Sequence, residues 1–163
     1  MKLCIFILLL PAIVSAQNSQ LPEIENVLNK VNSIINVSPG QERNPEALRE
    51  YFMPNAKFTV HMHSSAFPSP VESIGLDEFI ELLKDEYYEQ GYEERITGHT
   101  VEEYNGIAHA FQSFYAKDSE GEEVNGLSSY QLVYLEGKWR IVSILWTDDS
   151  NGKPVPEKFV KRE

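Results

Sequence analysis

Cysteine is nearly absent from this chain, and its absence excludes several kinds of chemistry. Among 163 residues only Cys4 is a cysteine, and it lies inside an apolar N-terminal run. If that run is removed, the remaining chain has no disulfide, no thiol nucleophile and no cysteine ligand for a metal. Such a chain depends on its hydrophobic core for stability, and roughly 150 residues are enough to form one.

Basic residues are also few. The chain has 14 lysines and arginines against 25 aspartates and glutamates, which gives a formal net charge of −11. Nucleic acids and anionic membrane surfaces are polyanions, so this charge disfavours both as partners. We therefore expect no nucleic-acid partner.

The first sixteen residues have the pattern of a secretory signal peptide. Lys2 precedes an apolar run that ends at Val14, and Val14-Ser15-Ala16 matches a cleavage pattern of small residues. The alternative, an uncleaved anchor, would need roughly 20 apolar residues to span a bilayer, whereas this run has about a dozen. We predict cleavage near Ala16-Gln17, no stable membrane anchor, and a secreted or periplasmic location.

The rest of the chain predicts one domain over residues 17–150 and a C-terminal arm over 151–163. Apolar periodicity and turn residues predict helices at 21–37, 44–53 and 75–90, a loop at 64–73, and strands at 56–64, 92–104, 107–117, 124–135 and 138–146. Helices followed by a run of antiparallel strands indicate an α+β fold. The long strands favour a curved antiparallel sheet wrapped around the three helices of the N-terminal half.

The last predicted strand is apolar on both faces. Its odd-numbered positions, which share one face, include Trp139, Ile141 and Leu145. Its even-numbered positions, on the other face, include Val142, Ile144 and Trp146. A strand with one face in water should instead alternate apolar and polar residues. Both faces of this strand are therefore expected to be covered.

Four stretches carry a family resemblance: REYFMPNAKFTV, GLDEFIELL, GIAHAFQSFYAKD and LSSYQLVYLEGKWRIVSILWTDD. In this order they resemble the nuclear transport factor 2-like superfamily, a cystatin-like α+β cone that includes SnoaL-like cyclases and ketosteroid isomerase. Uncharacterised exported bacterial members are the most similar. With the first predicted helix, these stretches cover nearly all of the chain after the leader. The superfamily places enzymes, binding modules and assembly domains on one scaffold, so the resemblance indicates a fold more than an activity.

The resemblance implies how both sheet faces are covered. One face of such a sheet packs on the helices around an open-ended pocket, and the other commonly packs on a second subunit. It thus implies a homodimer through the outer face, including Trp139, Ile141 and Leu145. The alternative is an outer face partly covered by the C-terminal arm, with Trp139 and Leu145 half exposed. Val155 and Phe159 are the residues by which this arm is expected to attach to the body.

An overlay on the superfamily also implies which side chains face the pocket. The ligand-binding set is Phe111, Ser113, Tyr115, Ser129, Gln131, Val133, Ile144 and Trp146, with Arg140 and Val142 on the same face. Apolar walls with a few polar groups are typical of a small-molecule site. The carboxylates that ketosteroid isomerase uses are replaced by Val60 and Ser129, which excludes a steroid isomerase of that type.

His109, on the same implied face, is the predicted general acid or base, because its ordinary pKa of about 6.5 suits proton exchange near neutral pH. Asp149, or Asp148 beside it, would orient the histidine or act as a second acid, and Glu94 is a weaker candidate. The alternative is a core histidine that only bonds Tyr115 or Ser129, with solvated aspartates.

His61 and His63 share one face of a predicted strand, a spacing that can bind zinc or copper when a third ligand converges. Phe58, Val60 and Met62 of the same strand claim the inward face, and no His-rich or Cys-rich segment offers a third ligand. No Gly-rich phosphate loop is present either. We predict no metal site and no cofactor.

Three functions remain open from the sequence. The first is an exported domain that binds an unknown small, partly apolar molecule in the cone, without catalysis. The second is a cofactor-independent hydratase, isomerase or cyclase that uses His109 with an aspartate. The third is a structural dimerisation module whose cone is filled by side chains.

Overall fold

The computed structural model describes residues 20–36, 42–63, 70–85, 92–118 and 120–160. The predicted signal peptide lies outside this range. Among the described residues the elements are α1 (Leu21–Ile35), η1 (Pro45–Glu50), β1 (Phe52–His61), β2 (Val71–Gly75), α2 (Leu76–Leu82), β3 (Glu93–Tyr104), β4 (Ile107–Lys117), β5 (Glu123–Leu135), β6 (Lys138–Asp148) and η2 (Glu157–Phe159). The predicted α+β order is confirmed, with α1, η1 and α2 ahead of the four consecutive strands β3 to β6.

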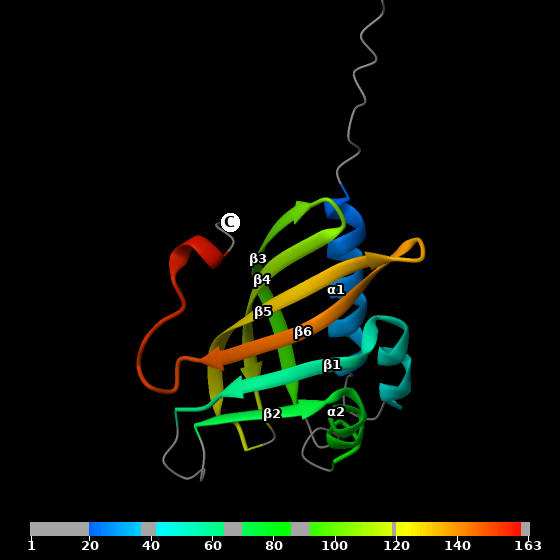
Figure 1. Ribbon diagram of the computed structural model, residues 1–163. Coiled ribbons are helices and arrows are strands. Elements are labelled where there is room, and N and C mark those ends of the chain that lie inside the picture. Colours follow the sequence, from blue (N-terminus) through cyan, green and yellow to red (C-terminus); the bar gives the residue numbers. More distant parts are fainter. Residues whose placement is uncertain (1–19, 37–41, 64–69, 86–91, 119, 161–163) are drawn as a thin grey trace, which may run out of the picture.

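The strands form one curved sheet in the order β2-β1-β6-β5-β4-β3 (Figure 1). β1 and β6 run parallel, and the other neighbours run antiparallel. The sheet is therefore mixed, whereas an all-antiparallel sheet was predicted. β2 was not predicted from the sequence. It lies where the predicted loop ends, directly in front of α2.

Two tight turns set the register of the long hairpins. Asn105 and Gly106 join β3 to β4 with φ of 49° and 83°, and Glu136 and Gly137 join β5 to β6 with φ of 52° and 83°. Two successive positive φ values match the right-handed twist of the flanking strands. These turns were predicted at the same residues, and they are confirmed.

The core lies between the sheet and the helices. Ile24, Leu28 and Val31 of α1 and Phe79 and Ile80 of α2 are buried on the concave side of the sheet. In Figure 1 α1 crosses behind the long strands and α2 lies near β1 and β2. The apolar stripe of each helix thus faces the sheet, as its periodicity predicted.

A β-bulge explains why β6 is apolar on both faces. Leu132 of β5 pairs with Ile141, but the next residue, Gln131, pairs with Ser143, so Val142 is skipped. One extra residue reverses the parity of a strand. Trp139 and Ile141 therefore point inward before the bulge, and Ile144 and Trp146 point inward after it.

The bulge also corrects the predicted outer face. Trp139 is 2% exposed and Ile141 is 0% exposed, and both belong to the core. Leu145 alone of the three lies outside, with 50% of its surface exposed. The inward face of β6 is thus buried in the core from Trp139 to Ile144, and Trp146 packs against this core partly buried.

The C-terminal segment covers part of the outer face. The Phe159 ring packs on the Phe111 ring with centroids 4.8 Å apart, and the Ser113 hydroxyl donates to the Phe159 carbonyl over 2.8 Å. In Figure 1 this segment returns beside β3 and β4. The arm thus covers the outer face at Phe111 and Ser113, as the alternative to a dimer expected, whereas Trp139, half exposed in that alternative, is buried.

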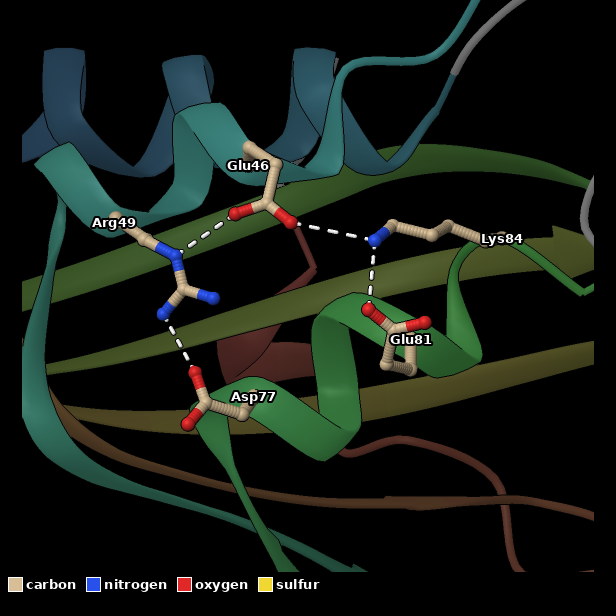
Figure 2. Close-up of polar contacts among 5 residues, drawn as sticks. All are labelled: Glu46, Arg49, Asp77, Glu81 and Lys84. Atoms are coloured by element: carbon tan, nitrogen blue, oxygen red, sulfur yellow. Dashed lines mark hydrogen bonds and ion pairs between the residues drawn. The ribbon is translucent and has the colours of Figure 1, made fainter.

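A network of five charged residues joins η1 to α2 (Figure 2). Arg49 contacts Glu46 over 2.8 Å and Asp77 over 2.6 Å, and Lys84 contacts Glu46 over 3.3 Å and Glu81 over 2.7 Å. Hydrogen bonds from Arg49 and then Lys84 lower the pKa of Glu46. The network is solvent-exposed, so it contributes little to the stability of the fold.

Candidate functional site

A cavity of about 240 Å³ lies between the concave side of the sheet and the helices. Strands from both halves of the sheet contribute to it, together with the end of α1 and the inner face of α2. Its described lining consists of Ile35, Phe58, Phe79, Leu83, Tyr92, Glu94, Phe114, Ala116, Val124, Ser128, Tyr130, Ile144, Trp146 and Asp148.

Aromatic rings form much of the wall. Phe58 of β1 and Phe79 of α2 stack with centroids 4.1 Å apart and planes 16° apart. Phe114 lies across the strand pair from Gly126, where a Cβ atom would come within 2.0 Å of the Phe114 Cζ. Because Gly126 has no side chain, the Phe114 ring can lie flat over β5. This packing holds the ring in its place in the cavity wall.

Glu94 is the main polar group of the cavity. Its Oε2 accepts a hydrogen bond from the Tyr92 hydroxyl over 2.9 Å, and its Oε1 accepts one from the Asn32 amide over 3.1 Å. Asn36 of the α1 C-cap bonds both the backbone N–H and the carbonyl of Glu94. The carboxyl is thus held in place from β3 and α1.

Burial raises the pKa of Glu94, and the bonds from Tyr92 and Asn32 oppose that rise only in part. Desolvation disfavours the charged form of an acid, so the carboxyl keeps its proton to a higher pH than an exposed glutamate. A carboxyl of this kind, within a cavity, is able to donate a hydrogen bond or a proton to a bound molecule.

Further polar groups come from β5 and β6. The buried Tyr130 hydroxyl donates to Gln112 over 3.2 Å, and burial raises the pKa of this phenol, with the nearby Glu94 adding to the rise. Ser128 is buried beside it. Asp148 lies at the end of β6, and its Oδ1 accepts a hydrogen bond from the Ser150 N–H over 3.0 Å.

The structure brings two predicted ligand-binding residues to this cavity, Ile144 and Trp146. The predicted parity is wrong for β4 and β5, where Phe114, Ala116, Ser128 and Tyr130 face inward instead. Alternate residues of a strand point to opposite faces. The outer face therefore carries these predicted residues: His109, Phe111, Ser113, Tyr115, Ser129, Gln131 and Val133.

His109 and Asp149 are not brought together. The His109 ring bonds the Ser129 hydroxyl over 2.8 Å, so the alternative was right about this partner. It was wrong about the location, because the ring lies on the exposed outer face and not in the core. Asp149 instead accepts hydrogen bonds from the backbone and side-chain nitrogens of Asn125, over 2.9 and 3.1 Å. Asn125 and Gln131, the strand partner of His109, are six positions apart on β5, so about 20 Å separates the two groups.

The other predicted polar residues have structural partners. Tyr115 lies under the Arg95 guanidinium, 5.3 Å from the ring centroid. Gln131 accepts from the Ser143 hydroxyl over 3.0 Å. His109 and Gln131, together with Ile107 and Val142, line a separate open hollow of about 580 Å³ on the outer face.

His61 and His63 lie beside each other, with ring centroids 4.6 Å apart. His63 contacts the Thr147 hydroxyl over 3.0 Å. Within the described ranges, no group of three or more His, Cys, Asp or Glu side chains is placed to hold a metal ion.

Glu94 was a weaker candidate in the sequence, although a signal for it exists. On β4 the inward set includes Ala108, Ala110 and Ala116, small residues that leave room for α1 and for the cavity. Reading these alanines as the inward set would have given the correct parity. Glu94 pairs with Ala116 and would then face inward.

Solved structures resemble this arrangement. A nuclear transport factor 2-like protein with a cystatin-like fold from Novosphingobium aromaticivorans matches with a TM-score of 0.61, at 13% identity, over 88% of this chain and 90% of its own. A cystatin-like protein of unknown function from Nostoc punctiforme gives a TM-score of 0.60 at 11% identity, over 80% and 91%. A nuclear transport factor 2-like protein of unknown function from Silicibacter pomeroyi gives 0.54 at 16% identity, over 79% and 95%.

No family model matches the chain, and no curated protein matches it in sequence. The curved sheet around three helices defines a cystatin-like α+β fold. More narrowly, the chain has the nuclear transport factor 2-like form of this fold, as the resemblance in its sequence implied. No helix within the described segments has both the length and the apolar character that crossing a bilayer requires.

Proposed function

We propose that this protein is an exported binding protein that holds a small, partly apolar molecule in the cavity between the sheet and α2. The observation that carries the proposal is the combination in one cavity of stacked aromatic walls with a positioned, desolvated carboxyl, Glu94. Small-molecule sites usually combine apolar walls with a few convergent polar groups. At about 240 Å³ the space suits a small ligand.

Tryptophan fluorescence tests this proposal, because the chain has only two tryptophans and Trp146 alone lines the cavity. In a Trp139→Phe variant, a panel of benzyl alcohol, phenol, cyclohexanol, benzylamine and benzoic acid should produce saturable changes in emission. A Trp146→Phe variant, which keeps the core Trp139, is the matched control and should show none. If every compound leaves the emission unchanged, or Trp139 alone responds, the binding function is wrong.

A second candidate function is a cofactor-independent enzyme in which Glu94 exchanges a proton with the bound molecule. The raised pKa of Glu94 favours it, since a general acid works best when its pKa lies near the operating pH. Glu94→Gln should lower such an activity by roughly 10²–10⁴-fold while ligand affinity changes far less. An open cavity supports either function over a purely structural module with a filled cone.

We also propose a homodimer through the uncovered part of the outer face. Ile107, Val142 and Leu145 are exposed apolar residues on this face, while the C-terminal segment covers Phe111. Exposed apolar patches commonly mark association sites. Leu145→Glu should give the monomer mass in light scattering, and Leu82→Glu, which changes an exposed leucine of α2, is the control. An unchanged mass for Leu145→Glu would exclude this interface.

Export and processing have a direct test. Mature protein recovered outside the cytoplasm should begin at or near Gln17. Exported material that still begins at Met1 would contradict this part of the proposal.

A further inference from the structure

The aromatic rings and the charges of the cavity lining favour one class of ligand. Six aromatic side chains line it: Phe58 on β1, Phe79 on α2, Tyr92 just before β3, Phe114 on β4, Tyr130 on β5 and Trp146 on β6. The acidic side chains in the lining are Glu94 and Asp148. Among the described lining residues there is no lysine, arginine or histidine. Every charge that these residues supply to a ligand is therefore negative.

Aromatic faces carry partial negative charge and attract cations. A cation over such a face gains most where water is excluded, and rings gathered around a quaternary ammonium group are a common use of this attraction. Carboxylates in the same cavity add a formal counter-charge at low effective dielectric. An anionic ligand would instead face repulsion with no basic partner among these residues.

We infer that the cavity selects an organic cation, a protonated amine or quaternary ammonium group carried on a small apolar body. This inference rests on the proposed function and names its ligand class. The rings would enclose the apolar body and the N-methyl or N–H groups, and Asp148 and Glu94 would supply the counter-charge. The net charge of the chain, −11, also raises the concentration of cations near the protein.

The pH dependence of ligand affinity gives a second test of this inference. The raised pKa of Glu94 keeps this carboxyl protonated in the empty cavity over part of the pH range, whereas a bound cation favours its ionised form. Binding a cation should therefore release a proton, and affinity should rise with pH until Glu94 is ionised. Among the described lining residues, the other titratable groups are Asp148 and the phenols of Tyr92 and Tyr130, and burial raises the pKa of the Tyr130 phenol. Arg43 lies behind this lining, where its guanidinium donates hydrogen bonds to the carbonyls of Ile35 and Leu83.

The test uses two matched pairs in which a quaternary nitrogen replaces a quaternary carbon: choline with 3,3-dimethylbutan-1-ol, and phenyltrimethylammonium with tert-butylbenzene. Binding is measured through Trp146 in the Trp139→Phe protein. The cation of at least one pair should bind about 30-fold more tightly than its neutral partner, which corresponds to ~2 kcal/mol for a desolvated cation–aromatic contact. Its affinity should rise with pH, by at most about tenfold per unit.

Variants separate counter-charge from packing. Asp148→Asn and Glu94→Gln should each weaken the cation about tenfold, while the neutral partner, which reports an intact cavity, keeps its affinity. Glu94→Gln should also remove the pH dependence that Glu94 causes. Glu93→Gln changes net charge by the same amount on an exposed neighbour and should leave both ligands unaffected.

The outcomes distinguish this inference from the proposed function. If neutral partners bind as tightly as cations, or if only neutral or acidic members of the earlier panel bind, the cation class is wrong and the binding function stands. If no compound of either set binds, the binding function fails as well.

Discussion

Gly126→Ala tests how the aromatic wall of the cavity is built. An added Cβ would lie 2.0, 2.5 and 2.6 Å from the Cζ, Cε1 and Cε2 atoms of Phe114. Carbon atoms prefer about 3.5–4.0 Å, so the ring must move by roughly 1.5 Å. Phe114 is buried and lines the cavity, so this shift disturbs the close-packed wall.

The expected cost is that of overpacking, about 1–3 kcal/mol, which lowers the Tm by about 2–12 °C for a chain of this size. Ligand affinity in the cavity should fall as well, because the wall has moved. Differential scanning calorimetry and the Trp146 titration measure the two effects. Gly75→Ala is the control, since a Cβ there meets nothing within 4 Å.

A double-mutant cycle makes the reasoning refutable. Phe114→Val removes the ring that the new Cβ would strike, so Gly126→Ala should cost little in that background. Contacting residues show coupling of about 0.5–3 kcal/mol in such cycles. If Gly126→Ala leaves the Tm unchanged in the natural background, or costs the same in both backgrounds, Phe114 does not lie over Gly126.

Three further predictions concern Glu94, His109 and the C-terminal segment. Glu94 has a raised pKa, so the folded protein holds a proton that the unfolded chain releases. The free energy of unfolding should therefore fall as the pH rises above ~4.3, the ordinary pKa of a glutamate. The total fall is about 1.4 kcal/mol for each unit by which the pKa of Glu94 in the folded protein exceeds that in the unfolded chain. Glu94→Gln should remove this fall in urea titrations, and an identical pH dependence in both proteins would contradict it. His109→Gln should leave affinity for cavity ligands unchanged in the Trp146 titration, because the ring lies on the outer face. A large loss of affinity would show that His109 faces the cavity, as the sequence predicted. Phe159→Ala should speed proteolysis of the C-terminal segment by removing its contact with Phe111, whereas Lys153→Ala should not, and equal cleavage rates would show that Phe159 does not anchor the segment.

The sequence predicted the fold well where local rules act alone. Asn105-Gly106 and Glu136-Gly137 adopt the positive φ that a two-residue hairpin requires, so the ends of β3, β4, β5 and β6 next to these turns followed from them. The apolar stripes of α1 and α2 likewise predicted their buried faces.

The site was harder to predict because it depends on which alternate residues of each strand face the cavity, and on the one extra residue of the β6 bulge. The bulge at Val142 reverses β6, and no local propensity marks it. Trp139 and Ile141 therefore appeared to face outward. On β4 both faces hold apolar residues, because Phe111 on the outer face is covered by the C-terminal segment and Phe114 on the inner face forms part of the cavity wall. Only tertiary packing distinguishes these two faces.

A crystal structure of the protein purified from its natural host tests the central claim most directly. The proposed function predicts density for a small molecule between Phe79 and Trp146, with a polar or charged group within hydrogen-bond or ion-pair distance of Glu94. A cavity filled by its own side chains, with the Phe114 or Trp146 ring turned into the space and no added molecule, would contradict it.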